Sequence, residues 1–300
     1  GKNMINDIQN SFNIQDLEIL SGIKAHTIRI WEKRYELLNP VRKGRNIRSY
    51  SLSDLQKLLN VSLLMHHGNK ISTLSKLSDS ELADKAKSVS LEKFQNNYNI
   101  NSIIVSMFSL DEELFEEIYQ SQIEKQSFSD VFLNTYLPLL SHIGILWQTN
   151  GIKPAHEHFI SNLIYQKIAL NTASLPAVTN ESKRINILFL PQGEIHELSL
   201  YFMNYKLKME GERTIYLGRD IPHSNLLDIN SHFKEINWIC YFLIDRTEEE
   251  KADFVVKMDD LLKNTKNTCA IVGQIWTDYK PDKNPKKIKF LNSFDQIVFK

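Results

Sequence analysis

Apolar residues between positions 12 and 175 recur at intervals of three to four, as they do along one face of a helix. Pro40 and the Gly151–Pro154 segment break this pattern, so helices are expected to end there. Pro138 and Gly144 interrupt a later apolar stretch without ending it. The spacing predicts helices over residues 12–20, 24–35, 51–67, 110–123, 128–147 and 155–171, with Ser53 capping the third.

From residue 184 onward the pattern changes to short apolar runs separated by amphipathic segments. Short apolar runs of this kind are typical of buried strands, and strands that alternate with helices favour a parallel sheet. We therefore predict an α/β domain with a doubly wound, flavodoxin-like (Rossmann-type) parallel sheet. The predicted strands are Ile185–Leu190, Thr214–Leu217, Trp238–Ile244, Ala270–Val272 and Gln296–Phe299, and the helices between them cover 196–210, 224–234 and 248–264.

These patterns predict a multidomain chain. Residues 1–75 hold the first three helices and a basic segment, and residues 179–300 hold the α/β domain. Between them, residues 93–178 are expected to form a four-helix bundle, because short loops join amphipathic helices there. Residues 76–92 are polar and predict either a linker or a loosely packed helix.

The charge of the chain is balanced in total but unevenly placed. The formal net charge is zero, yet residues 24–48 contain eight Lys or Arg and two Glu. A basic segment in a neutral chain indicates a local contact with a polyanion, although a charge run can also be a solvated face. No apolar run approaches the ~18 residues of a membrane span and no secretion leader is visible, so we expect a cytoplasmic protein without membrane contact. Cys240 and Cys269 lie in apolar runs and are expected to be buried, reduced thiols.

The basic segment coincides with a helix-turn-helix pattern. Ser21-Gly22-Ile23 joins two predicted helices, and the second helix of such a pair enters the major groove of DNA. Ile28 and Trp31 would face the core, while Val41–Tyr50 indicates a short basic hairpin whose side chains suit phosphate contacts. The candidate DNA contacts are His26, Thr27, Arg29, Lys33, Arg34 and Tyr35 on the helix and Arg42, Arg45, Arg48 and Tyr50 on the hairpin.

This segment resembles the winged helix-turn-helix of MerR-type transcriptional regulators. The matching residues are Thr27–Tyr35, Leu37-Leu38, Pro40 and Arg48–Tyr50. The family usually has Gly at the place of Glu36 and Tyr at the place of Ile47, and neither departure removes a positive charge. The resemblance implies that the chain binds double-stranded operator DNA.

A second candidate site lies after the first predicted strand of the α/β domain. A loop with Gly193 leads from Phe189 to His196, at the mouth of the next helix. The carboxyl edge of a parallel sheet is where such folds bind ligands. A His can ligate a metal through one ring nitrogen while a carboxylate holds the other, and Glu194 is the candidate carboxylate. Glu194 and His196 could alternatively form an acid–base pair.

Two motifs in this part of the chain resemble cobalamin-binding proteins. Glu194-x-His196-x-x-Ser199 is similar to the Asp/Glu-x-His-x-x-Gly signature of cobalamin-binding domains, and Trp147 precedes Glu157-His158 by the spacing found in the helical cap of the light-sensing CarH/LitR regulators. The resemblance implies that His196 is the lower cobalt ligand of adenosylcobalamin or methylcobalamin, oriented by Glu194. It also implies that Trp147, Glu157 and His158 cover the upper face, and that Gly273 lies beside the nucleotide tail.

Four residues depart from this pattern. Gln148 stands where light-sensing members carry a His that ligates cobalt after photolysis, and an amide is a poor cobalt ligand beside an imidazole. Tyr241 and Phe242 stand where a small Ser is usual, and Gln274 replaces the second Gly of a Gly-Gly pair. Aromatic rings there would fill the space of the tail, and overpacking such a slot costs ~1–3 kcal/mol. The sequence therefore leaves cobalamin binding open.

Three functions are consistent with these features. The first is a transcriptional regulator that senses cobalamin, and through it light, and changes its dimeric or tetrameric state and its operator affinity. The second is a regulator without cofactor, in which the cobalamin-like domain serves only for oligomerisation or partner binding. The third is a corrinoid carrier for a methyltransferase, which has no use for a basic winged module. No paired acids or phosphate loop stands out, so we expect that the chain is not an enzyme.

Overall fold

The computed structural model describes residues 11–44, 47–89, 95–148, 151–178, 184–283 and 285–296. The chain forms two compact units, Gly1–Asn162 and Leu163–Lys300, called here the N-terminal and C-terminal units. The division lies inside the helix α10 (Pro154–Ala173), whereas the sequence suggested a boundary near residue 178.

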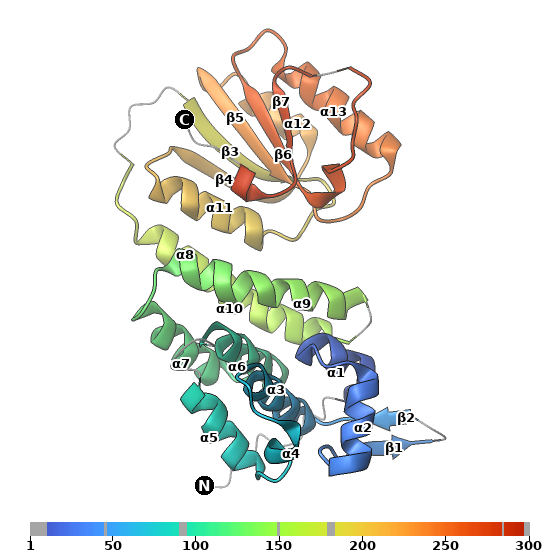
Figure 1. The fold of residues 1–300 in the computed structure, drawn as a ribbon. Helices are drawn as coiled ribbons and strands as arrows, with labels where there is room; N and C mark the ends of the chain where they lie inside the picture. Colours follow the sequence, from blue (N-terminus) through green and yellow to red (C-terminus); the bar gives the residue numbers. More distant parts are fainter. Residues whose placement is uncertain are drawn as a thin grey trace. The chain divides into compact units, whose positions relative to one another are not determined.

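The N-terminal unit begins with the predicted helix-turn-helix, formed by α1 (Ile14–Ser21) and α2 (Ala25–Tyr35) (Figure 1). Asn13 and Asp16 form a capping box that starts α1. Gly22 ends α1 with φ +72°, a conformation that costs least for glycine. Ile28 and Trp31 are the buried residues of α2, as predicted.

The predicted basic hairpin is also present. β1 (Val41–Lys43) pairs antiparallel with β2 (Ile47–Ser49), and α3 (Leu52–His66) follows. The cap of α3 is Ser51 rather than Ser53, because the Ser51 side chain accepts the Asp54 N–H while the Asp54 carboxylate accepts the Ser51 N–H. Phe12 and Tyr50 exchange two backbone hydrogen bonds of 2.9 Å, which join the end of the wing to the start of α1.

The segment interpreted as a linker or a loosely packed helix contains helical structure. α4 (Ile71–Leu74) and α5 (Asp79–Val89) follow α3, and α5 packs against α3 with Leu82 and Ala86 buried. Only these two residues of α5 are buried, which explains why its apolar stripe was weak in the sequence. Residues 90–92 of the segment lie outside the described ranges.

Further helices complete the helical block: α6 (Gln95–Ser109), α7 (Glu112–Ile123), α8 (Phe128–Val131), the π-helical turn η1 (Phe132–Tyr136) and α9 (Leu137–Gln148). The π turn precedes Pro138, and the Leu137 N–H donates to the Phe132 carbonyl. This wider turn lets the helix continue through a proline that lacks an N–H. α6 packs on α3 and α9 on α1, so the block and the winged region share one core. Within the described ranges no helix is both long and apolar enough to cross a membrane.

The C-terminal unit contains the predicted parallel sheet (Figure 1). Its strands are β3 (Arg184–Pro191), β4 (Thr214–Ile221), β5 (Glu235–Tyr241), β6 (Thr268–Val272) and β7 (Ile288–Leu291). Their spatial order is β4-β3-β5-β6-β7, and all pairings are parallel. This is the flavodoxin-like order, in which the chain changes direction beside the first strand of the sheet, so the fold class is confirmed.

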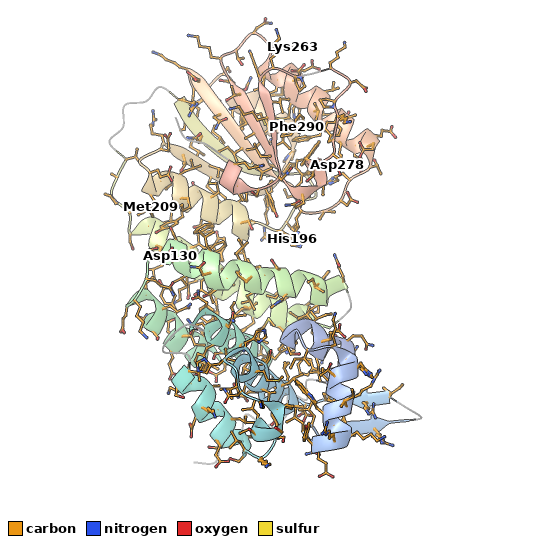
Figure 2. The ribbon with its side chains drawn as sticks, viewed as in Figure 1. Asp130, His196, Met209, Lys263, Asp278 and Phe290 are labelled. Atoms are coloured by element: carbon orange, nitrogen blue, oxygen red, sulfur yellow. The ribbon has the colours of Figure 1, made fainter. Side chains whose placement is uncertain are left out.

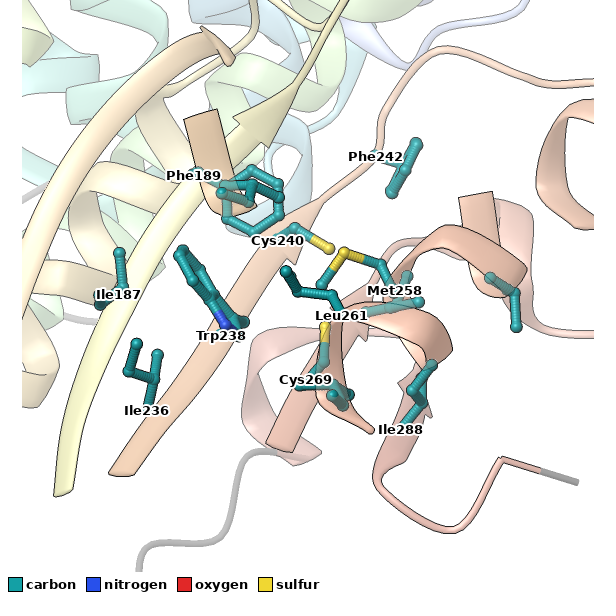
Figure 3. Packing of buried hydrophobic residues seen from close by; sticks show 14 of the residues in the cluster. Ile187, Phe189, Ile236, Trp238, Cys240, Phe242, Met258, Leu261, Cys269 and Ile288 are labelled. Carbon is teal, nitrogen blue, oxygen red and sulfur yellow. The ribbon is translucent and has the colours of Figure 1, made fainter. Parts of the chain in front are cut away.

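Helices cover both faces of this sheet. α11 (Leu198–Met209) packs on one face against Leu188 and Ile239. α12 (His223–Ile229) and α13 (Glu248–Leu262) pack on the other face, which buries Phe189, Trp238 and Met258 (Figure 3). Cys240 and Cys269 are buried free thiols in this second layer, as expected.

The prediction of the fifth strand was wrong. The edge strand is Ile288–Leu291, while Gln296 ends the short 3₁₀ turn η3 (Phe294–Gln296) and residues 297–299 lie outside the described ranges. In the edge strand Ile288 is buried and Lys289 is exposed. A half-solvated strand of four residues gives a weaker signal than the continuous apolar run on which the prediction was based.

A row of polar side chains fixes the register of the central strands. Asn186, Asn237 and Thr268 are paired across β3, β5 and β6. The Asn237 amide donates to Asn186 Oδ1 at 2.9 Å, and the Thr268 hydroxyl donates to Asn237 Oδ1 at 3.0 Å. A slip of one residue would bury these groups without partners, so the row favours the observed pairing.

Glu36 provides a test of the helix-turn-helix geometry. It ends α2 with φ 51° and ψ 36°, a left-handed conformation that glycine adopts at less cost. We expect Glu36→Gly to increase the free energy of unfolding by about 0.5–1 kcal/mol, after the entropy that glycine adds to the unfolded chain is subtracted. Urea unfolding with an unchanged m-value would measure it. Glu36→Ala is the control and should give no gain; an equal gain from alanine would contradict the conformational explanation.

Candidate functional sites

The solvent face of α2 carries the predicted DNA contacts. His26, Arg29, Lys33 and Arg34 are exposed, and Thr27 is half-buried. Tyr35 is also half-buried, with the Arg34 guanidinium 5.4 Å from its ring centroid. Since Ile28 and Trp31 fill the core, the opposite face of α2 is left polar and cationic. A face of this kind can contact phosphates and base edges.

Glu32 is a residue of this region that the sequence analysis did not single out. Its side chain is mostly buried, and its Oε2 lies 3.6 Å from Arg48 Nε. Arg48 is the direct partner of Arg42 across the wing hairpin, where two like charges repel. Glu32 offsets part of this repulsion and ties β2 to α2. The only feature of the sequence that pointed to this role of Glu32 was its position between Arg29 and Lys33 in the same helix.

Two predicted DNA contacts differ from these exposed residues. Tyr50 is only 1% exposed and packs in the core, so its side chain cannot reach a phosphate from the wing. Burial raises the pKa of the Tyr50 hydroxyl, and the nearby Glu32 carboxylate raises it further. Arg42 is exposed on the wing, whereas Arg45 lies outside the described residues.

In the C-terminal unit, the loop from β3 to α11 is held by a buried carboxylate. Glu194 is fully buried, and its Oε1 accepts the Ile244 N–H at 3.1 Å and lies 3.6 Å from Arg246 Nη2. Burial raises the pKa of Glu194, while the amides of Ile244 and Leu243 and the charge of Arg246 oppose the rise. These contacts of Glu194 tie this loop to the loop after β5, and the orientation of His196 by Glu194 stays a prediction. Its Oε2 is buried and has no hydrogen-bond partner among the described residues.

Arg246 and Asp220 complete this support. Arg246 Nη2 also lies 3.3 Å from the Gln192 carbonyl, and its guanidinium carbon lies 5.7 Å from the Phe242 ring centroid. The Asp220 carboxylate accepts the Gly193 N–H at 2.9 Å. Neither residue was singled out from the sequence, because Asp220 lies near the end of β4 and Arg246 follows β5, and both meet the loop only in the folded sheet.

The His196 side chain is exposed at the end of this supported loop (Figure 2). The next residue, Glu197, accepts the Tyr216 hydroxyl at 2.9 Å. The ring of Tyr201 lies 4.7 Å from that of Tyr216 and 4.6 Å from that of Tyr165, on the part of α10 that belongs to the C-terminal unit. The loop is thus fastened on both sides of His196 while the imidazole stays accessible.

Three exposed apolar side chains lie in the same two loops. Ile195 is 55% exposed, Leu243 is 52% exposed and Ile244 is 40% exposed. The hydrogen bond between Ile244 and Glu194 brings the loop after β5 to the loop that carries His196. The carboxyl edge of the sheet therefore offers an imidazole with apolar neighbours. The sequence could not identify these three residues as exposed, because apolar residues at the end of a strand also fit buried positions.

The two aromatic residues expected to fill the tail space lie in different layers. Phe242 is buried on the α13 side, where its ring lies 4.9 Å from Phe254 and 5.2 Å from Trp276. Tyr241 is half-buried on the α11 side and contacts Phe294 at 5.2 Å. Gly273 follows β6, where a methyl group would collide with the Phe242 carbonyl oxygen, and Gln274 begins the short turn η2 (Gln274–Trp276). The close Phe242 carbonyl therefore explains why glycine is needed at position 273, whether or not a ligand binds.

The predicted cap residues lie at two neighbouring helix ends in the N-terminal unit. Trp147 is 51% exposed near the end of α9, and Gln148 beside it is also exposed. Glu157 and His158 lie in the first turns of α10, with His158 Nε2 3.8 Å from Glu157 Oε2. Glu157 also accepts the Ser161 hydroxyl at 2.7 Å. The short connection from α9 to α10 brings these side chains to one end of the helices.

Two family profiles match the chain. The profile described as MerR HTH family regulatory protein matches residues 12–81, and the one described as B12 binding domain matches residues 100–170. The first runs from α1 into the first turn of α5, and the second lies in the helical block that contains Trp147, Glu157 and His158.

Curated relatives and solved structures are also similar to the chain. It is 23% identical over 225 residues to the HTH-type transcriptional repressor CarH of Myxococcus xanthus, covering 73% of this chain and 74% of the relative. It is 27% identical over 268 residues to the repressor CarA of the same organism, covering 88% and 86%. A Methanosarcina barkeri monomethylamine corrinoid protein is 14% identical with a TM-score of 0.49, covering 66% of this chain and 90% of the other. A cobalamin-binding protein from Desulfitobacterium hafniense is 14% identical with a TM-score of 0.27, covering 55% and 80%.

The two TM-scores lie below 0.5, so no conclusion is drawn from these structures. The profile matches and the two repressors agree with the geometry described above. An exposed basic helix face lies in the residues that the first profile matches, and the exposed Trp147 lies in those that the second matches. The chain therefore joins a MerR-type helix-turn-helix to a segment that matches a B12 binding domain, and it is homologous to the CarH and CarA transcriptional repressors.

Proposed function

We propose that this protein binds operator DNA through α2 and the wing, and that cobalamin bound to the remaining helices and the sheet domain changes its affinity for that DNA. The observation that carries the proposal is the exposed cationic face of α2 in a chain whose helical block matches a B12 binding domain. Oligomerisation to a dimer or tetramer would raise operator affinity, because a second bound module acts at high effective concentration. The site of action is the cytoplasm, and no catalytic residue is assigned.

Each residue of the DNA-binding face has a distinct role in this proposal. His26, Thr27 and Arg29 lie in the first half of α2, from which base edges are reached. Lys33, Arg34 and Arg42 are exposed cations that suit phosphate contacts. Glu32 is a positioning residue, since it holds Arg48 and the wing against α2.

The residues at the sheet edge fit a corrinoid on the side that faces its metal. An imidazole is a suitable ligand for cobalt, so the His196 side chain would hold the metal of the cofactor. His196 is the exposed imidazole, and Ile195, Leu243 and Ile244 supply apolar contact area beside it.

The remaining cofactor residues have supporting roles. Glu194 fixes the loop that carries His196, and Trp147, Glu157 and His158 are the residues of the helical block that would contact the cofactor. Adenosylcobalamin would supply a cobalt–carbon bond that light can break. Position 148 carries Gln where light-sensing regulators have a His. We therefore do not propose that a second imidazole from this position ligates the cobalt. Tyr241 and Phe294 must leave room for the nucleotide tail, and a colourless protein would instead favour a cofactor-free platform.

Arg42→Ala tests the DNA interface. One fewer phosphate contact should weaken binding to a mixed-sequence duplex and reduce the slope of log affinity against log salt by about 1. Fluorescence anisotropy at several salt concentrations would measure both. Lys266→Ala removes an exposed charge in the C-terminal unit and is the matched control. Tyr50→Phe should keep the wild-type slope because its ring is buried. An unchanged slope for Arg42→Ala would contradict the proposed contact.

His196→Ala tests the cofactor site. Wild-type protein mixed with adenosylcobalamin in the dark and desalted should retain the corrinoid absorption, and His196→Ala should lose it or shift its bands, because the imidazole donor is gone. His232→Ala removes another exposed imidazole from the same unit and should behave as the wild type. A colourless wild-type protein would refute cobalamin binding, and identical spectra for all three proteins would refute the role of His196.

A further inference from the structure

The connection between α9 and α10 touches the first helix of the DNA-binding region. The Gly151 N–H donates to the Leu146 carbonyl at 2.7 Å, which turns the chain at the end of α9. A methyl group at Gly151 would collide with Asp16 Oδ1 and lie 3.0 Å from Leu146 Cδ2. Only a residue without a side chain permits this approach. Gly151 lies between the cap residues Trp147 and Glu157, whereas Asp16 belongs to α1.

Asp16 cannot easily move away from Gly151. Its Oδ2 accepts the Asn13 N–H at 2.9 Å, and its own N–H donates to Asn13 Oδ1 at 2.8 Å, so the capping box holds both its side chain and its backbone. The residue is buried, and burial raises the pKa of its carboxyl group. Its Oδ1 has no hydrogen-bond partner within the described residues, which fits a tight contact. A displacement at Gly151 is therefore passed to the start of α1.

A second contact path joins the same two regions through aromatic rings. The His156 ring is buried and lies 5.4 Å from the Phe108 ring at 71°, and Phe108 lies 4.7 Å from Phe12 at 87°. Edge-to-face pairs of this kind have a preferred geometry, so a shift of one ring is opposed by the next. Phe12 in turn exchanges two backbone hydrogen bonds with Tyr50 at the end of the wing.

We propose that these two contacts form a joint, made of Gly151–Asp16 and His156–Phe108–Phe12, which couples the cap residues to the wing. This inference rests on the proposed function and specifies how the cofactor would regulate DNA binding. His156 directly precedes Glu157 and His158, so a ligand that repositions these side chains also acts on the buried ring beside them. The opposite effect must hold as well, since coupling between two sites is reciprocal: bound DNA changes the affinity for cobalamin by the same factor.

Gly151→Ala and Gly144→Ala separate this joint from a general effect of adding a methyl group. Both residues flank Trp147, but a Cβ at Gly144 meets no atom within 4 Å. The full-length variants would be titrated with duplex DNA, with and without adenosylcobalamin in the dark. We expect the ratio of the two DNA affinities, of the order of 5- to 150-fold for typical coupling, to fall toward one in Gly151→Ala and to stay at the wild-type value in Gly144→Ala. Gly151→Ala should still bind adenosylcobalamin by its absorption spectrum. A wild-type ratio in Gly151→Ala would overturn the joint.

A measurement without cofactor keeps the joint testable if cobalamin does not bind. Hydrogen exchange of the Phe12 and Tyr50 amides, which are paired with each other, reports whether the wing is held to α1. We expect faster exchange in Gly151→Ala and unchanged exchange in Gly144→Ala. Phe108→Leu removes the ring between Phe12 and His156 but keeps an apolar side chain there. It serves as a second variant and should also accelerate the exchange of both amides. Unchanged exchange in both Gly151→Ala and Phe108→Leu would overturn the joint. A wild-type protein that does not bind cobalamin would refute the proposed function alone.

Discussion

The parallel pairing of β3 between β4 and β5 is the constraint on which the sheet-edge site depends. Parallel strands end at the same edge, and the chain order reverses beside β3, so the loops that follow β3, β4 and β5 meet there. Glu194 and Arg246 come from the loops after β3 and β5 and Asp220 from the last residues of β4, and they bind one another or the backbone between them. The exposure of His196 at this edge is a consequence of that meeting.

Buried polar groups have different structural roles in the two units. In the sheet, the Asn186–Asn237–Thr268 row and the Glu194 carboxylate fix the register and the loop positions, because an unpaired buried polar group costs more than a hydrogen bond gains. In the winged region, Glu32 allows two arginines to face each other across the hairpin. A positively charged surface is thus stabilised by one mostly buried negative charge.

Close approach between chain segments explains two glycines, one of which the family resemblance assigned to ligand binding. Gly273 is needed because the Phe242 carbonyl occupies the space of a side chain. Gly151 is needed because Asp16 lies against it. Glu36, in contrast, adopts a left-handed conformation without being glycine, and this local strain is offset by the packing of α2 and the two leucines that follow it.

The sequence by itself determined the helix-turn-helix, the wing and the parallel sheet with its alternating helices, because periodicity, capping residues and strand–helix alternation are local signals. Ile28 and Trp31 were identified as core in this way. Tyr50 was misassigned because a wing sequence does not say which face its last residue presents, and the edge strand was missed because Lys289 weakened its apolar run. Only the tertiary structure brought Arg246 to Glu194 and Asp16 to Gly151. Such contacts join residues more than fifty positions apart, and their geometry arises from packing that no local pattern encodes.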